Sequence, residues 1–215
     1  MRPDPTNPNA MGTTVPPGFG ATPDRAGNFL SELPNEGTTE IWEIVNLTAD
    51  AHPIHTHLAQ FQLMNRQSFD VAKYMAFYAR WFPGGVFAPA YGPPLSYGNS
   101  TVSGGKYGGN PDVAPYLLGA ALPPNPNEAG WKDTVMVPPG MVTRFVVRWA
   151  PTTIPVGGTG GDPTTLHYSM EPDWGNYSYV WHCHIVDHED NEMMRPDQVV
   201  PMPGATRTYI QGVDY

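Results

Sequence analysis

The chain has 215 residues, of which 40% are hydrophobic and 14% charged, and its formal net charge is −9. The hydrophobic share suffices for a packed core and excludes global disorder, and the negative charge disfavours nucleic acid as a partner. No apolar run has the length needed to span a bilayer. The 23 Gly and 26 Pro favour a loop-rich, all-β protein over a helical one.

The composition predicts an N-terminal arm followed by one domain. Residues 1–36 are rich in Pro, Gly, Asn and Thr, as in an extended arm. Residues 37–215 would form the domain, interrupted at about 81–130 by a segment with ten Gly and nine Pro. We interpret this segment as a long irregular insertion, because loops of this length usually shape a site, cover an interface or are disordered.

Segments rich in β-branched and aromatic residues predict strands at 38–47, 54–64, 134–137, 142–149 and 178–184. In the fourth, Phe145, Val147 and Trp149 share one face, while Arg144 and Arg148 share the other. Several short strands with turn-rich connections predict a β-sandwich or barrel.

One short helix is expected in "SFDVAKYMAFYARWFPGG". Asp70 can cap its start, Pro83 and Gly84 can end it, and its aromatic residues at helical spacing are Tyr74, Phe77, Tyr78 and Trp81. We interpret this aromatic stripe as core packing rather than as a binding surface.

Six of the seven histidines fall in two short segments, "HPIHTH" and "HCHIVDH". Because neutral imidazole is the commonest metal ligand, the two segments predict metal binding. The seventh, His167, stands alone and is interpreted as an ordinary polar residue. The single cysteine, Cys183, excludes an internal disulfide and leaves three interpretations, namely a buried inert thiol, a nucleophile or a metal ligand.

Strand alternation divides these residues into two sets, since successive side chains of a strand point to opposite faces. The first set is Cys183 and His52, with His188 and Met193 available from the loop downstream. The second set contains His55, His57, His182 and His184.

The first set offers two imidazoles, a thiolate and a thioether, which is the ligand set of a blue-copper electron-transfer centre. Zinc stays an alternative, although it has little use for a thioether. A catalytic Cys/His dyad is a third possibility, but it leaves the other histidines without a purpose. The second set has too many imidazoles for one further ion. It adjoins the first set through the backbone of Cys183, which would give electrons a short covalent path between two redox centres.

The segments "HPIHTH" and "HCHIVDHEDNEMMRP" resemble the copper motifs in the third domain of the multicopper oxidases. The likeness is greatest to the bacterial spore-coat laccase and bilirubin oxidase branch, to which "GTTEIWEIVNLTADAHPIH", "GWKDTV" and "VPPGMVTRFVVRW" are also similar. It covers residues 37–82 and 130–200. It implies a cupredoxin-like Greek-key β-sandwich as the fold and copper as the metal.

The resemblance also implies a role for each ligand. His52, Cys183 and His188 would bind the type 1 copper with Met193 axial, His55 the type 2 copper, and His57, His182 and His184 the type 3 pair. Electrons from a small-molecule donor, phenolic or similar, would pass to the trinuclear cluster, where O2 is reduced to water. Glu189 matches an acidic residue that supplies protons there, and its alternative interpretation is an exposed loop carboxylate. Asp187 and Asp190 would accept hydrogen bonds from ligand imidazoles.

The resemblance is incomplete in two respects. The family's trinuclear cluster needs eight histidines and this chain offers four, so we expect the others from N-terminal cupredoxin domains on a separate chain or a cleaved part. The opening strands expected before residue 37 are also missing, and an open sheet edge is prone to pairing with another chain.

Two other functions stay open. A stand-alone blue-copper electron-transfer protein has no use for the H-x-H pairs, and a copper nitrite reductase needs fewer histidines at its second site. The N-terminal residues lack the apolar core of a signal peptide, so the sequence leaves localisation open. The resemblance is compatible with a secreted, periplasmic or spore-coat protein.

Overall fold

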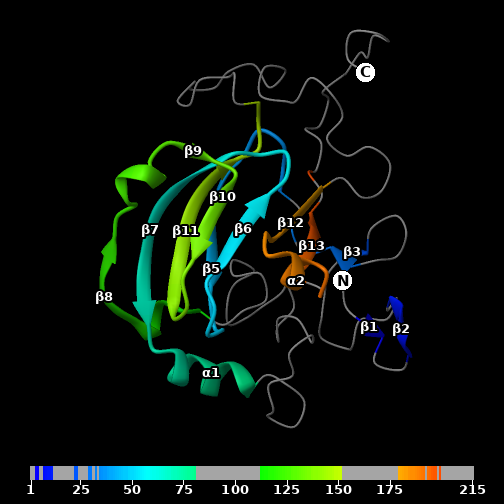
Figure 1. Ribbon diagram of the computed structural model, residues 1–215, viewed down its shortest axis with the longest axis horizontal. Helices are drawn as coiled ribbons and strands as arrows, with labels where there is room; N and C mark the ends of the chain where they lie inside the picture. The colour runs from blue at the N-terminus through cyan, green and yellow to red at the C-terminus, as the bar shows by residue number, and fades with distance from the viewer. Residues whose placement is uncertain are drawn as a thin grey trace.

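The computed structural model describes residues 3–4, 7–11, 22–23, 29–30, 32, 34–80, 112–151, 179–191, 193–197 and 199. Two antiparallel sheets make up most of it (Figure 1). The first has the order β5 (Thr39–Val45), β11 (Met141–Arg148), β7 (Phe61–Phe69) and β8 (Leu117–Leu122), with β9 (Trp131–Lys132) also on β7. The second has the order β10 (Thr134–Val137), β6 (His52–Thr56), β12 (Tyr179–Cys183) and β13 (Met194–Asp197).

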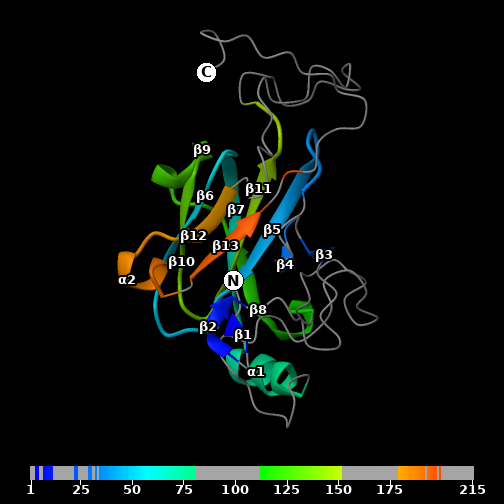
Figure 2. The ribbon, with the colours of Figure 1, turned by 90° about the vertical axis from the view of Figure 1, so that its right-hand side faces the viewer.

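The main core lies between these two sheets. Phe61, Phe145 and Val147 enter it from the first sheet, and Ile54 and Val137 from the second. The rings of Phe61 and Phe145 lie 4.3 Å apart, and each buried side chain of this size contributes about 1.5–3 kcal/mol by leaving water. In the side view of Figure 2, β6, β10 and β12 lie to the left and β5 and β11 to the right. The expected all-β, cupredoxin-like sandwich is confirmed.

The strand expected at 54–64 is wrong in one respect, because the structure has two strands there. Between β6 and β7 the chain turns at residues 57–60, where Leu58 has a φ of 63° and the Thr56 hydroxyl donates to the Ala59 carbonyl. The turn carries the chain from one sheet to the other, which the period-two pattern of a single strand cannot show. The strands expected at 38–47, 134–137, 142–149 and 178–184 are confirmed within a few residues.

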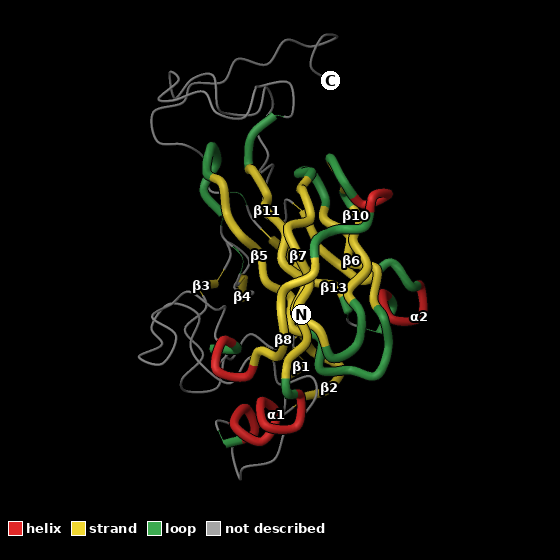
Figure 3. Tube along the Cα trace, turned by 90° about the vertical axis from the view of Figure 1, so that its left-hand side faces the viewer, coloured by secondary structure: helices red, strands yellow, loops and turns green. Residues whose placement is uncertain are grey.

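The expected helix is α1 (Val71–Ala79), which lies beyond the end of β7 (Figure 1). The Asp70 carboxylate caps it by accepting from the Lys73 N–H at 3.1 Å. Tyr74 and Tyr78 are buried in a second core cluster with Phe69, which confirms the packing interpretation. Trp81 lies outside the described residues. Figure 3 shows how little of the described chain is helical.

The arm and the insertion contain more regular structure than the sequence predicted. Residues 1–36 hold the short strands β1 (Pro3–Asp4), β2 (Asn7–Met11), β3 (Thr22–Pro23) and β4 (Phe29–Leu30), which pair as β1–β2 and β3–β4. Glu36 is buried, and the next residue, Gly37, donates its N–H to the Trp149 carbonyl. In the insertion, residues 112–130 contain the short helices η2 (Ala114–Tyr116) and η3 (Pro126–Glu128) and the strand β8, which extends the first sheet. Residues 81–111 lie outside the described part.

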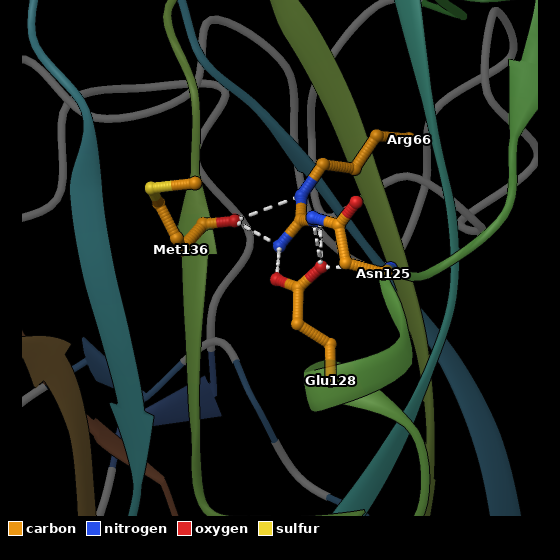
Figure 4. A network of polar contacts seen from close by, with 4 residues as sticks. All are labelled: Arg66, Asn125, Glu128 and Met136. Carbon is orange, nitrogen blue, oxygen red and sulfur yellow. Dashed lines mark hydrogen bonds and ion pairs between the residues drawn. The ribbon is translucent and has the colours of Figure 1, made fainter.

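An ion pair between a buried arginine and a half-buried glutamate joins the two sheets through η3 (Figure 4). The Arg66 guanidinium on β7 donates two hydrogen bonds to the Met136 carbonyl on β10 and binds both carboxylate oxygens of Glu128. The guanidinium holds the pKa of Glu128 at about 2, well below its ordinary value. Asn125 adds two hydrogen bonds to the same carboxylate.

The C-terminal elements differ from expectation in two ways. His188 lies on a short helix, α2 (Val186–Glu189), where a loop was expected. The strand β13 was not predicted, because its sequence has no alternating pattern, and it is held by pairing with β12. Within the described residues, no helix is long and apolar enough to cross a membrane.

Candidate metal centres

Three side chains of the first predicted set meet at one point. Cys183 Sγ lies 3.6 Å from His52 Nδ1 and 3.5 Å from His188 Nδ1, and the two Nδ1 atoms are 3.2 Å apart. Cys183 is fully buried and His52 is 5% exposed. The site lies in the sandwich because His52, Ile54 and Thr56 face inward along β6 and Cys183 of β12 is paired with Ile54.

The three atoms form a triangle that fits a metal ion. A point equidistant from all three lies about 2 Å from each, close to the metal–nitrogen and metal–sulfur bonds of about 2.0–2.3 Å in zinc sites. Two imidazoles and one thiolate in a trigonal arrangement are the ligands of blue-copper centres. The donor set and its spacing therefore fit copper.

Met193 lies next to this triangle. The Cys183 N–H donates to the Met193 carbonyl at 2.9 Å, and the Met193 N–H donates to the His188 carbonyl at 3.0 Å. The side chain of Met193 is half-buried against the main core, of which Cys183 is a member. Its role as an axial ligand stays a prediction.

The histidines of the second predicted set form a separate cluster. Ligand atoms of His55, His57 and His182 all lie within 4.8 Å of one another. The His184 ring lies 5.5 Å from that of His55 and 5.4 Å from that of His182. His182 is buried, whereas His57 and His184 are exposed. The structure thus assembles each of the two sets, and their assignment to individual copper ions stays a prediction.

Backbone carbonyls orient two imidazoles of this second cluster. His55 Nδ1 lies 2.9 Å from the Asp133 carbonyl, and His182 Nδ1 lies 3.1 Å from the Cys183 carbonyl. Since a carbonyl oxygen can only accept, Nδ1 carries the proton in each ring and Nε2 keeps the lone pair for a metal. A carboxylate oxygen of Glu189 lies 3.4 Å from His182 Nδ1.

One ring in each cluster, that of His52 and that of His57, favours the neutral state. Burial first, and then the neighbouring His188, lowers the pKa of His52, while Asp50 acts in the opposite direction. Burial, followed by His55 and His182, lowers the pKa of His57. A neutral imidazole has a free lone pair, so these shifts leave the rings of His52 and His57 ready to bind a metal at neutral pH.

Sequence analysis missed several residues that contact the ligands. Thr48 Oγ1 lies 2.6 Å from His52 Nε2, and Asp133 contacts His55 through its carbonyl. The "GWKDTV" motif, which contains Asp133, was noted only for its similarity to the family, and no role was predicted for Asp133. Within the described residues, neither the Asp187 nor the Asp190 carboxylate bonds a ligand imidazole; the Asp187 carbonyl accepts from Asn191 instead. His167 lies outside the described residues.

Comparisons with known proteins agree with this geometry. A family model described as multicopper oxidase matches residues 7–82. The laccase of Bacillus subtilis (strain 168) is 34% identical over 167 residues, covering 78% of this chain and 21% of that protein. The chain therefore contains a segment that matches the multicopper oxidase family model and is similar to multicopper oxidases over most of its length. This similarity points to copper as the metal that the clustered His and Cys side chains could bind.

Two further multicopper oxidases show the same partial coverage. The multicopper oxidase LPR1 of Arabidopsis thaliana is 32% identical over 80% of this chain and 24% of its own length. The crystal structure of the McoA multicopper oxidase from Aquifex aeolicus covers 83% of this chain and 23% of that chain, with 22% identity and a TM-score of 0.42.

The chain thus spans less than a quarter of the length of these relatives. The family model begins at residue 7, so the likeness starts earlier than residue 37, where the sequence motifs begin.

Proposed function

We propose that the chain is the C-terminal copper-binding part of a laccase-like multicopper oxidase. It would oxidise phenolic or similar donors by one electron and couple this to reduction of O2 to water. One observation carries the proposal: Cys183 belongs to one metal-binding cluster and the adjacent His182 to the other. A pair of bonded residues that reach two centres suits electron transfer between them, and a structural metal site does not require it.

Each group of ligand residues has a proposed copper ion. His52, Cys183 and His188, with Met193 nearby, would hold the type 1 copper. His55 would hold the type 2 copper, and His57, His182 and His184 would contribute to the type 3 pair. Copper bound there supplies one-electron redox chemistry at neutral pH.

Two properties of Glu189 support a role in proton supply. Its carboxylate oxygen lies 3.4 Å from His182 Nδ1, and it raises the pKa of His57 against the stronger effects that lower it. It is also half-buried, so it connects the histidine cluster to the surface. Reduction of O2 to water consumes protons, and a carboxyl group at this position can deliver them.

The second cluster is half built on this chain. Four imidazoles lie together, and two of them, His57 and His184, are exposed. Relatives that contain this region are more than four times longer than the part matched. The proposal is that N-terminal cupredoxin domains, as a separate chain or a cleaved part, cover these rings and add the missing histidines.

Copper titration of the purified chain tests the proposal. We expect about one tightly bound copper with the intense visible absorption of a Cys thiolate–copper centre, and little O2 uptake with a phenol. Adding the N-terminal domains of the same oxidase should restore O2 uptake. Absence of the thiolate–copper band would refute the type 1 assignment. Oxidase activity of the chain alone would refute the half-site, and nitrite turnover without O2 uptake would favour a nitrite reductase.

A further inference from the structure

The two ring nitrogens of His52 have different partners. Nδ1 faces the metal-binding triangle, 3.6 Å from Cys183 Sγ. Nε2 lies 2.6 Å from the hydroxyl oxygen of Thr48. A hydroxyl can donate or accept, so this contact alone does not determine which ring nitrogen carries the proton.

The surroundings of Thr48 decide the direction of that hydrogen bond. The side-chain amide of Asn46, which is buried, donates to the Asp50 carbonyl at 2.8 Å and to the Val137 carbonyl at 3.0 Å. Both amide protons are used, so the Asn46 oxygen faces Thr48. There it accepts from the Thr48 N–H at 2.9 Å and lies 2.8 Å from the hydroxyl.

Each step of this chain of contacts fixes the next. The Asn46 oxygen, at 2.8 Å, and the Asp50 carbonyl, at 3.2 Å, can only accept, so the Thr48 hydroxyl donates its single proton to one of these two oxygens. The hydroxyl then has only lone pairs to offer His52 Nε2, which must therefore be the donor. A neutral imidazole has one N–H, so Nδ1 is left without a proton and its lone pair points at the triangle.

We propose that Asn46 and Thr48 are positioning residues that hold His52 in its Nε2–H tautomer. This presents Nδ1 to the metal before any metal binds. The tautomer itself follows from contacts within the chain, while its importance for a copper centre rests on the function proposed above.

The second cluster shows the opposite arrangement. His55 and His182 have backbone carbonyls at Nδ1, which leave Nε2 as the free nitrogen. The chain thus selects the ligand nitrogen of a histidine by placing an acceptor beside the other one. His55 Nδ1 also lies 3.1 Å from the Thr134 hydroxyl, but its backbone carbonyl would remain after a substitution there. At His52 the contact described is with a side-chain hydroxyl, that of Thr48, so substitution can remove it.

Nitrogen NMR of the metal-free full chain tests the inference directly. At a pH well above 6.5, the ordinary pKa of histidine, the shifts of the His52 ring nitrogens report which one is protonated. We expect a single Nε2–H tautomer in the native chain. Thr48→Val should produce a mixture, and Thr48→Ser should restore the single tautomer. Thr143→Val is the matched control, since this buried hydroxyl has no hydrogen-bond partner among the described residues.

Copper titration of the same variants gives the second measurement. Thr48→Val should weaken copper binding by about 10-fold, as removal of a partner of a ligand histidine typically does, with recovery in Thr48→Ser and no change in Thr143→Val. A native Nδ1–H tautomer would overturn the inference whether or not the variants fold. So would a Thr48→Val chain that keeps the single Nε2–H tautomer. If the native tautomer is Nε2–H but no copper binds, the proposed function fails while the positioning of His52 stands.

Discussion

Cys183 Sγ and His52 Nδ1 lie 3.6 Å apart although 131 positions separate them in the chain. Pairing of β12 with β6 produces this proximity, because it sets Cys183 opposite Ile54 and places His52 within reach. The same pairing sets His182 opposite His55, on the other face of the sheet. One antiparallel strand pair therefore builds both clusters, and changes in either can be tested separately.

Replacing the thiol should abolish the first centre and leave the second. For Cys183→Ser we expect loss of the visible thiolate–copper band. Losing a partner of a ligand histidine typically weakens metal binding about 10- to 100-fold, and losing the ligand itself should weaken it more. The fold should persist, because serine is nearly the same size. The measurement is absorbance during copper titration, with circular dichroism for the fold. Met136→Leu, which removes an exposed sulfur elsewhere, should keep the band.

Removing the carboxylate of Glu189 should slow O2 reduction without removing copper. In the oxidase assembled with its N-terminal domains, Glu189→Gln is expected to lower O2 uptake by about 100-fold, the lower end of general acid catalysis. Copper content and the visible band should stay unchanged. The control is Glu43→Gln, because Glu43 and its partner Arg144 both lie on the first sheet, which does not carry the histidine clusters. Unchanged O2 uptake in Glu189→Gln at every pH would exclude a proton-supplying role.

The Arg66–Glu128 ion pair should contribute measurably to stability. Glu128→Gln keeps the shape and removes the charge, so we expect a loss of about 1.5–3 kcal/mol in the free energy of unfolding, measured by urea denaturation. Lys73→Gln breaks an ion pair whose lysine is 78% exposed and should cost clearly less, because water screens exposed charges. Equal losses in the two variants would contradict the importance of burial.

The same ion pair predicts a dependence on pH. The pKa of Glu128 is about 2 in the folded chain and 4.5 in the unfolded chain, because the Arg66 guanidinium stabilises the carboxylate. Its contribution is therefore complete above pH 4.5 and is lost as the pH falls towards 2. Glu128→Gln should remove this part of the acid dependence, which denaturation curves at several pH values can measure.

Asp197 should have the opposite effect on the pH dependence of stability: it should destabilise the folded chain as the pH rises. It is 2% exposed, and neither carboxylate oxygen has a hydrogen-bond partner among the described residues. Burial, and then Glu32, raise its pKa from 3.8 to about 7. The protonated form therefore suits the folded state, and a stability cost develops as the pH rises from 3.8 through 7.

Asp197→Asn keeps a neutral group of the same size. We expect it to raise the melting temperature above pH 7 and to have little effect below pH 3.8. Thermal unfolding at both ends of this range provides the measurement. Asp190→Asn, at an exposed position, should change stability equally little at the two ends. A melting temperature of Asp197→Asn that is lower than native above pH 7 would show that the carboxylate is paired in the folded chain.

Much of the site could be predicted from the sequence. The spacing of "HPIHTH" and "HCHIVDH" and the alternation of side chains along a strand sorted the ligands into the two sets that the structure assembles. These are local properties, because the direction of a side chain on a strand depends only on its position. The cap at Asp70 and the buried faces of α1 and β11 were predictable for the same reason.

Other features depended on contacts between distant segments. Sheet pairing and packing determine the turn at Leu58, the strand β13 and the burial of Asp197. A local sequence pattern contains no information about these long-range contacts. The choice between Nδ1 and Nε2 at His52 and His55 also depends on tertiary structure. It depends on which acceptor lies beside the ring, namely the Thr48 hydroxyl or the Asp133 carbonyl. The sequence by itself determined which atoms can bind metal, and the tertiary structure decided which nitrogen of His52 and of His55 is free to bind it, because hydrogen bonds from outside the ligand motifs orient these two rings.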